Sequence, residues 1–168
     1  MNRLSVDDFR VARKMPLVLV LDNVRSLNNI GSVFRTSDAF ALAGIAICGI
    51  SACPPSPEIH KTALGAEDSV QWQYFKNTDE ALSSLREDGY VIVCLEQVQG
   101  SVLLQDFVPD RGRKYALIIG NEVDGVAQSV VDMADICLEI PQSGTKHSLN
   151  VSVSAALAIW QFYKTLYL

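Results

Sequence analysis

Short apolar segments alternate with helix-like segments along most of this chain, and no other feature of the sequence restricts the fold as strongly. Runs rich in branched and aromatic residues have the length and flanks of buried strands at residues 17–21, 45–50, 90–95, 115–119 and 136–140. The segments between and after them have helical spacing or composition. Because strands alternating with helices build a mostly parallel sheet covered on both faces, we predict an α/β fold.

Helical periodicity predicts where the covering helices lie. The first predicted helix begins at Asn29 and ends before Gly44. Three further helices are predicted at residues 78–87, 126–133 and 149–166. The apolar stripe of the last helix holds Val153, Ala156, Leu157 and Trp160. Residues 53–57 contain three prolines and are predicted to form a loop.

The length and apolar content of the chain predict one domain over residues 1–168. The 168 residues, 49% of them apolar, suffice for one core and are too few for two ordinary domains. The apolar runs of residues 17–21 and 91–95 are far shorter than the roughly 20 residues that cross a bilayer, so no membrane span is expected. Residues 1–8 are polar and acidic where an export signal would be apolar. We therefore expect a cytoplasmic protein.

The cysteines and histidines do not have the spacing of a metal site. No C-x-x-C pair occurs, and His60 and His147 are the only histidines. Scattered cysteines beside apolar runs are typical of buried, reduced thiols, which is what we expect of Cys48, Cys53, Cys94 and Cys137. We predict no bound metal.

The charge of the chain is unevenly distributed. The formal net charge of −5 argues against binding nucleic acid by bulk electrostatics. Residues 1–35 nevertheless carry six basic and three acidic side chains, so residues 1–15 form a short basic arm on an acidic body. A second cluster, Arg111, Arg113 and Lys114, either extends this basic patch or is a solvated turn.

Ligands of parallel sheets bind beyond the carboxyl ends of the strands, which draws attention to the loops after Leu21, Leu95, Ile119 and Ile140. The loop after Ile119 is a turn with a glycine at each end, Gly120 and Gly125, where a ligand can approach the backbone closely. No Lys-Ser/Thr follows it and no G-x-G-x-x-G occurs, so neither an NTPase nor a standard dinucleotide site is supported.

The loops after Ile140 and Leu21 each allow two interpretations. The first runs into the last helix through Ser148, Asn150 and Ser152, which can serve a ligand or simply cap the helix. The second leads into a helix that carries Arg35 beside its apolar stripe. This arginine either acts in function or forms a surface ion pair with Asp38.

Taken together, these segments resemble the three signature motifs of the SpoU (TrmH-like) family in the SPOUT superfamily. The matching segments are residues 29–36 (Asn-Ile-Gly-Ser-Val-Phe-Arg-Thr), residues 119–125, and Ile140-Pro141 with Gly144 and residues 148–152. Their order and spacing agree with the family, and the match covers nearly the whole chain. Gln142 departs from the apolar residue that is usual there.

The resemblance implies an RNA methyltransferase that transfers a methyl group from S-adenosylmethionine to a ribose 2′-hydroxyl of tRNA or rRNA. It also implies a C-terminal trefoil knot and a homodimer with the active site at the subunit interface. The positions that match the family's cofactor-binding residues are Leu95, Gly120, Ile140, Ser148 and Leu149.

The same resemblance suggests roles for the catalytic residues. It implies that Arg35 engages the RNA phosphate and helps to remove the 2′-proton. The residues implied to orient Arg35 and the ribose are Asn29, Glu122, Ser148 and Asn150. Two related alternatives stay open: a base methyltransferase of another SPOUT branch, and a non-catalytic knotted RNA-binding protein. A hydrolase using Ser148 or Ser152 with His147 would lack a nucleophile-elbow motif.

Overall fold

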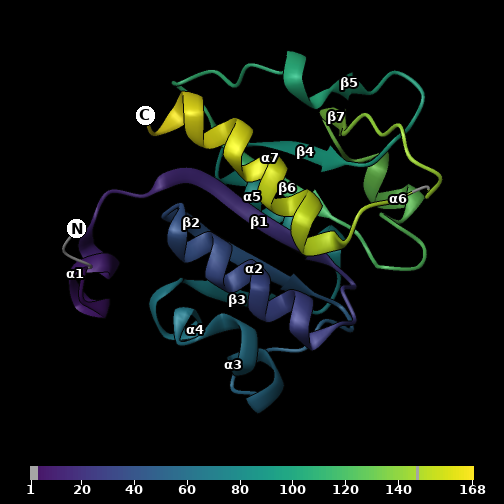
Figure 1. The fold of residues 1–168 in the computed structure, drawn as a ribbon. Coiled ribbons are helices and arrows are strands. Elements are labelled where there is room, and N and C mark those ends of the chain that lie inside the picture. Colours follow the sequence, from purple (N-terminus) through teal and green to yellow (C-terminus); the bar gives the residue numbers. More distant parts are fainter. Residues whose placement is uncertain (1–3, 147) are drawn as a thin grey trace.

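The computed structural model describes residues 4–146 and 148–168, which fold around a parallel sheet in the order β3-β2-β1-β6-β4-β7-β5 (Figure 1). The strands are β1 (Met15–Asp22), β2 (Leu42–Cys48), β3 (Trp72–Phe75), β4 (Tyr90–Leu95), β5 (Val102–Leu103), β6 (Lys114–Ile119) and β7 (Ile136–Glu139). The helices are α1 (Val6–Val11), α2 (Leu27–Ala39), α3 (Pro57–Ala63), α4 (Ala66–Ser69), α5 (Thr78–Glu87), α6 (Gln128–Val131), α7 (Val151–Leu166) and the short 3₁₀ turn η1 (Leu104–Asp106). The predicted α/β fold is confirmed.

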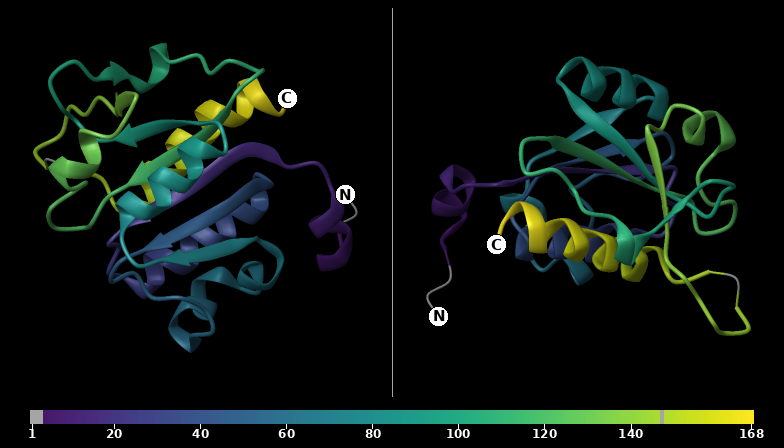
Figure 2. Two further views of the ribbon diagram at one scale, coloured as in Figure 1. Left: turned by 180° about the vertical axis from the view of Figure 1, so that it is seen from behind. Right: turned by 90° about the horizontal axis from the view of Figure 1, so that it is seen from above.

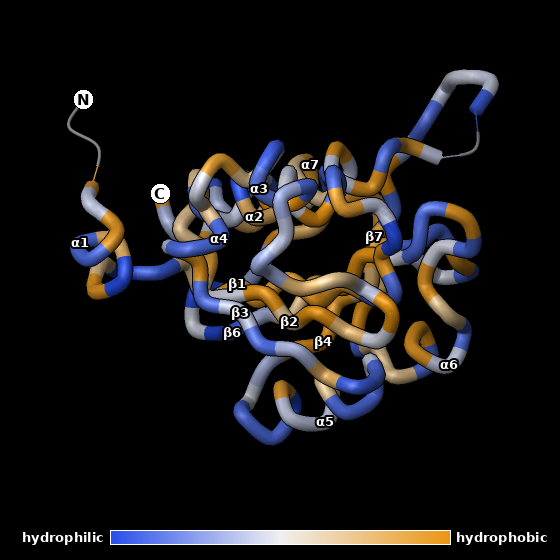
Figure 3. Tube along the Cα trace, turned by 90° about the horizontal axis from the view of Figure 1, so that it is seen from below, coloured by the Kyte–Doolittle hydropathy of each residue, from blue (hydrophilic) through white to orange (hydrophobic). Residues whose placement is uncertain are grey.

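Helices cover both faces of the sheet, and this explains why the strands are apolar throughout. Figure 2 shows α2 and α7 on one face and α5 with α6 on the other. Successive side chains of a strand point to opposite faces, so Leu19 joins the core beneath α2 and α7 whereas Val20 joins the core beneath α5. Figure 3 shows the apolar strands enclosed between these two layers.

Four predicted boundaries around α2 are wrong. The helix begins at Leu27 rather than at Asn29, and β2 begins at Leu42 rather than at Ile45. The helix ends at Ala39 rather than running on to Gly44, because Ala41 adopts the left-handed conformation (φ 50°) and turns the chain directly into β2. Gly44 lies inside β2, and that strand ends at Cys48 rather than at residue 50. At Gly44 a Cβ would lie 3.1 Å from the backbone oxygen of Gln71, so the glycine allows the segment that leads into β3 to pass close by.

The apolar stripe that the sequence predicts on α7 is not the face that packs on the sheet. Val153, Leu157 and Trp160 of the predicted stripe are exposed. The residues that pack toward the sheet are Ala155, Ala158, Ile159, Phe162 and Leu166. The helix has apolar residues on two faces, and periodicity alone does not distinguish which face meets the sheet.

Several short elements were not predicted from the sequence. They are α1, α3, α4, β3, β5 and η1, each too short to show a clear period. The prediction of a loop at residues 53–57 is wrong at its last residue, because Pro57 begins α3. A proline is tolerated in a first helical turn, where its missing N–H would have no partner within the helix.

The four cysteines are free thiols, as predicted, although only Cys48 and Cys94 are buried. Burial raises the pKa of the Cys48 thiol to about 12. Within the described ranges, His, Cys, Asp and Glu form no group of three or more that could hold a metal ion. None of the helices in the same part of the chain is both long and apolar enough to cross a membrane.

Candidate active site

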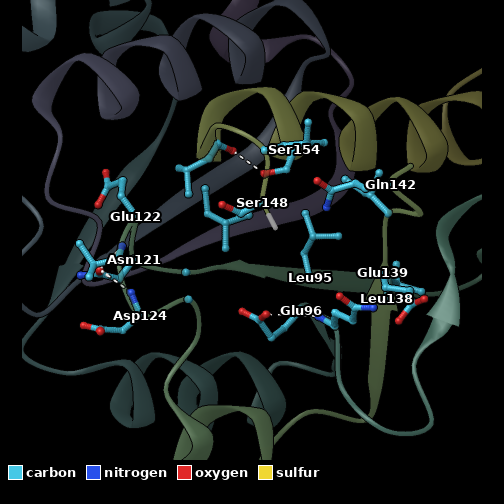
Figure 4. A pocket seen from close by; sticks show the side chains of 18 residues that line it. Leu95, Glu96, Asn121, Glu122, Asp124, Leu138, Glu139, Gln142, Ser148 and Ser154 are labelled. Carbon is cyan, nitrogen blue, oxygen red and sulfur yellow. Dashed lines mark hydrogen bonds between the residues drawn. The ribbon is translucent and has the colours of Figure 1, made fainter. Parts of the chain in front are cut away.

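A cavity of about 390 Å³ lies at the carboxyl ends of β4, β6 and β7, against the start of α7 (Figure 4). Its lining comes from the loops after Leu95, Ile119 and Ile140, three of the four loops singled out from the sequence. All five positions that match the family's cofactor residues line it: Leu95, Gly120, Ile140, Ser148 and Leu149. The fourth loop, after β1, belongs to the hydrogen-bond network beside the cavity.

The turn after β6 requires glycine at both of its ends. The backbone N–H of Asn121 donates to the oxygen of Gly125 at 2.9 Å, and the Gly125 N–H donates back to the oxygen of Asn121 at 3.0 Å. A Cβ on Gly120 would lie 2.3 Å from the carbonyl carbon of Gly125, closer than side-chain atoms approach a backbone. Gly125 itself has φ +70°, which side-chain-bearing residues rarely adopt.

Five consecutive backbone N–H groups of this turn already have partners inside the protein. Those of Val123 and Asp124 donate to Asn121 Oδ1, and that of Gly125 donates to the Asn121 oxygen. The next two donate to carboxylates: Val126 to Glu96 Oε2 at 3.0 Å, and Ala127 to Asp22 Oδ2 at 3.1 Å.

The two carboxylates come from the strands on either side of β6. Asp22 ends β1, and Glu96 follows the last residue of β4. Asp22 is buried and also accepts a 2.6 Å hydrogen bond from Thr78 Oγ1 at the start of α5. The turn is therefore fixed from both neighbouring strands.

Glu122 joins this turn to the start of α2. Its carboxylate accepts hydrogen bonds from the backbone N–H groups of Arg25 at 3.0 Å and Ser26 at 2.9 Å, and from Asn29 Nδ2 at 3.1 Å. Partial burial acts to raise the pKa of Glu122, but these donors outweigh it and hold the pKa below its ordinary value. A carboxylate beside a helix N-terminus is also favoured by the helix dipole.

Asn150 extends the network to the start of α7. Its Nδ2 donates to Asn29 Oδ1 at 3.1 Å, while its Oδ1 accepts the N–H groups of Ser152 at 2.9 Å and Val153 at 3.3 Å and so caps the helix. The capping interpretation of Asn150 is therefore correct, and the residue also contacts the first motif. A chain Glu122–Asn29–Asn150 connects all three motifs.

The structure places Ser148 and Arg35 outside this chain of hydrogen bonds. Ser148 lines the cavity. Arg35 is exposed on α2, about 9 Å along the helix axis from Asn29. Its interpretation as an ion pair with Asp38 is wrong, because Asp38 Oδ1 instead accepts a 2.6 Å hydrogen bond from Ser69 Oγ, and no ion pair of Arg35 is formed within residues 4–146 and 148–168.

Asp22, Glu96 and Asn121 hold the site together and were missed in the sequence. Asp22 and Glu96 stand at the carboxyl ends of predicted strands, so the strand-end rule could have singled them out. Asn121 lay inside a recognised motif. Its role in accepting two N–H groups of its own turn depends on the turn's conformation.

The geometry agrees with comparisons to known proteins. The sequence pattern of the SpoU rRNA Methylase family matches residues 16–160. The chain belongs to this family. The match leaves residues 1–15, the basic arm, outside it.

SpoU-family relatives cover most of this chain. A mouse protein, tRNA (guanosine(18)-2'-O)-methyltransferase TARBP1, is 31% identical over 87% of this chain and 9% of its own length. The 23S rRNA (guanosine-2'-O-)-methyltransferase RlmB of Vibrio vulnificus is 27% identical over 96% of this chain and 64% of its own length. The crystal structure of an AdoMet-bound rRNA methyltransferase from Sinorhizobium meliloti superimposes with a TM-score of 0.82 at 25% identity, over 93% of this chain and 59% of that one. This chain thus spans less than two thirds of each of these relatives.

Proposed function

We propose that this SpoU-family chain is an S-adenosylmethionine-dependent methyltransferase that modifies a ribose 2′-hydroxyl in RNA. The observation that carries the proposal is the Glu122–Asn29–Asn150 hydrogen-bond chain, which joins the three motifs beside a cavity of about 390 Å³. The names of the mouse and Vibrio relatives, both 2'-O-methyltransferases, support this choice over a base methyltransferase.

The residues that line the cavity suit S-adenosylmethionine. Leu95 and Leu149 offer apolar surface to the flat adenine ring of the cofactor. Carboxylates such as Glu139 can accept hydrogen bonds from the cofactor's ribose hydroxyls and its ammonium group. The positions proposed to hold the cofactor are Leu95, Gly120, Ile140, Ser148 and Leu149. When bound, the cofactor supplies a methyl group on a positively charged sulfur. Transfer would join that carbon to O2′ as its bond to sulfur breaks, and the hydroxyl proton would leave by way of Arg35 and the RNA phosphate.

The catalytic roles are assigned by the family resemblance. We propose that Arg35 holds the RNA phosphate and helps to remove the 2′-proton, because it is a cation on the solvent face of α2. Asn29, Glu122, Ser148 and Asn150 would orient the ribose and position the reacting atoms in line. An arginine is ordinarily protonated, so proton removal through Arg35 relies on the phosphate beside it.

The proposal extends to the working state of the protein. We propose a homodimer that acts on tRNA or rRNA in the cytoplasm without a bound metal. An exposed stripe of α7, formed by Val153 (48% exposed), Leu157 (45%) and Trp160 (46%), supports the dimer because apolar side chains so arranged favour a partner surface. The trefoil knot and the single domain over residues 1–168 stay predictions.

Incubation of the purified protein with S-adenosylmethionine and RNA, followed by nucleoside mass spectrometry, tests the reaction. We expect a 2′-O-methylated nucleoside from either a tRNA or an rRNA substrate. A methyl group on the base would instead identify a base methyltransferase. Failure to bind S-adenosylmethionine in calorimetry would favour the non-catalytic RNA-binding alternative. Comparing ribose-methylation maps of RNA from cells with and without the gene would then identify the modified nucleotide.

A further inference from the structure

The proposed cofactor cavity is negatively charged. Four carboxylate side chains line it, and its lining contains no lysine or arginine among the residues that the structure describes: Glu96, Glu122, Asp124 and Glu139 are the acids. Figure 4 shows Glu96 on the same side of the cavity as Glu139 and Asp124. A charged group in such a cavity interacts more strongly than in bulk water.

The backbone of the turn after β6, one wall of the cavity, does not offset this charge. The N–H groups of residues 123–127 all donate within the protein, so none of them can serve as a donor to an anionic ligand. Loops that bind phosphate use free N–H groups of this kind. This wall of the cavity therefore lacks the anion-binding donors of a nucleotide phosphate site and offers carboxylate acceptors in their place.

Glu96 contributes both to the negative charge of the cavity and to the hydrogen bonds of the turn after β6. Its Oε2 accepts the N–H of Val126 at 3.0 Å, and a Cβ built on Gly125 would lie 2.4 Å from the same oxygen. The carboxylate is thus pressed against the turn that forms one wall, at the end of β4 beside Leu95. It supports the wall and also brings a negative charge to the cavity.

We infer that Glu96 is a specificity residue that makes the cavity prefer the cationic methyl donor to the product left after transfer. S-adenosylmethionine carries a positive sulfonium, whereas S-adenosylhomocysteine lacks the transferred methyl group and has a neutral sulfur. A fixed carboxylate therefore favours the donor by its charge and promotes release of the product. The inference rests on the proposed function.

Calorimetric dissociation constants for S-adenosylmethionine and S-adenosylhomocysteine test this role. Glu96→Gln keeps an oxygen that can accept the Val126 N–H and removes the charge. We expect it to weaken binding of the methyl donor about three- to tenfold, with little change for the product, which is the size of effect that one partly solvated charge produces. The selectivity of the unaltered protein should also fall as salt is added, and that of the variant should not.

Glu87→Gln is the matched control, because it makes the same chemical change on an exposed residue of α5, away from the cavity. It should leave both constants unchanged. Equal weakening of both ligands in Glu96→Gln would show that Glu96 only supports the wall, and unchanged constants would show that its charge is not sensed; either result overturns the inference. If the unaltered protein bound neither ligand, the proposed function itself would fail.

Discussion

At Arg35, an effect of substitution on catalysis can be distinguished from an effect on folding. It is exposed on α2, and Asp38, its expected partner, is hydrogen-bonded to Ser69 instead. We therefore expect Arg35→Ala to change the free energy of unfolding by no more than roughly 0.5 kcal/mol. The cavity does not include Arg35, so cofactor affinity should survive as well.

Methyl transfer by Arg35→Ala should nevertheless fall by about two orders of magnitude or more, the usual effect of losing a group that assists proton transfer. Arg35→Lys serves as the control for charge and should not restore the rate, because lysine lacks the planar fork that grips a phosphate. Single-turnover rates and calorimetry measure the two properties separately. A variant that lost cofactor binding along with activity, or that unfolded, would make Arg35 a structural residue.

The basic arm, proposed to contact RNA, also makes contacts within the protein. Its three cations within the described residues already interact within the chain. Arg10 donates to the backbone oxygen of Asp68 at 2.8 Å, the Arg13 guanidinium lies 4.9 Å from the centre of the Tyr167 ring, and Lys14 lies over Phe9. Such interactions leave part of each charge facing solvent. RNA binding by the arm stays a prediction.

Replacing Arg10, Arg13 and Lys14 together by glutamine should weaken RNA binding and flatten its salt dependence. The slope of log affinity against log salt should drop by about 0.7 to 0.9 for each phosphate that the arm no longer neutralises. Thermal unfolding of the variant checks that the three substitutions have not disturbed the fold. The Arg111→Gln/Arg113→Gln variant tests the second basic cluster in the same assay. An unchanged slope in the triple variant would show that the arm does not contact RNA.

At the scale of the whole molecule, the exposed stripe of α7 predicts a homodimer. Leu157 lies at its centre. Next to it, Trp160 contacts the ring of Phe40, the residue directly after α2, with 5.9 Å between centroids, so the apolar surface continues from α7 to the end of α2. A buried charge within such a surface is costly. Leu157→Glu should therefore shift the protein to monomers in sedimentation velocity and reduce methyl transfer.

Val108→Glu, an equally drastic change at an exposed valine between η1 and β6, should leave the assembly intact. Sedimentation of the unaltered protein as a folded, fully active monomer at working concentration would rule the dimer out.

The local pattern of the sequence predicted five of the seven strands and the loops that line the cavity. The predicted bounds of α5 and β4 match the structure, because apolar spacing and flanking residues over ten or fewer positions carry that information. The glycines at 120 and 125 indicated a tight turn, and its backbone conformation requires them. The family motifs singled out Asn29, Glu122 and Asn150 as a set.

Only the tertiary structure decided which of these parts meet. Asn29 bonds to Glu122 across 93 positions of sequence and to Asn150 across 121. The placement of β6 between β1 and β4 is what brings Asp22 and Glu96 to the two sides of one turn. Strand order and the choice of the buried face of α7 depend on packing contacts over the whole chain. The local periodicity of the sequence does not contain this information.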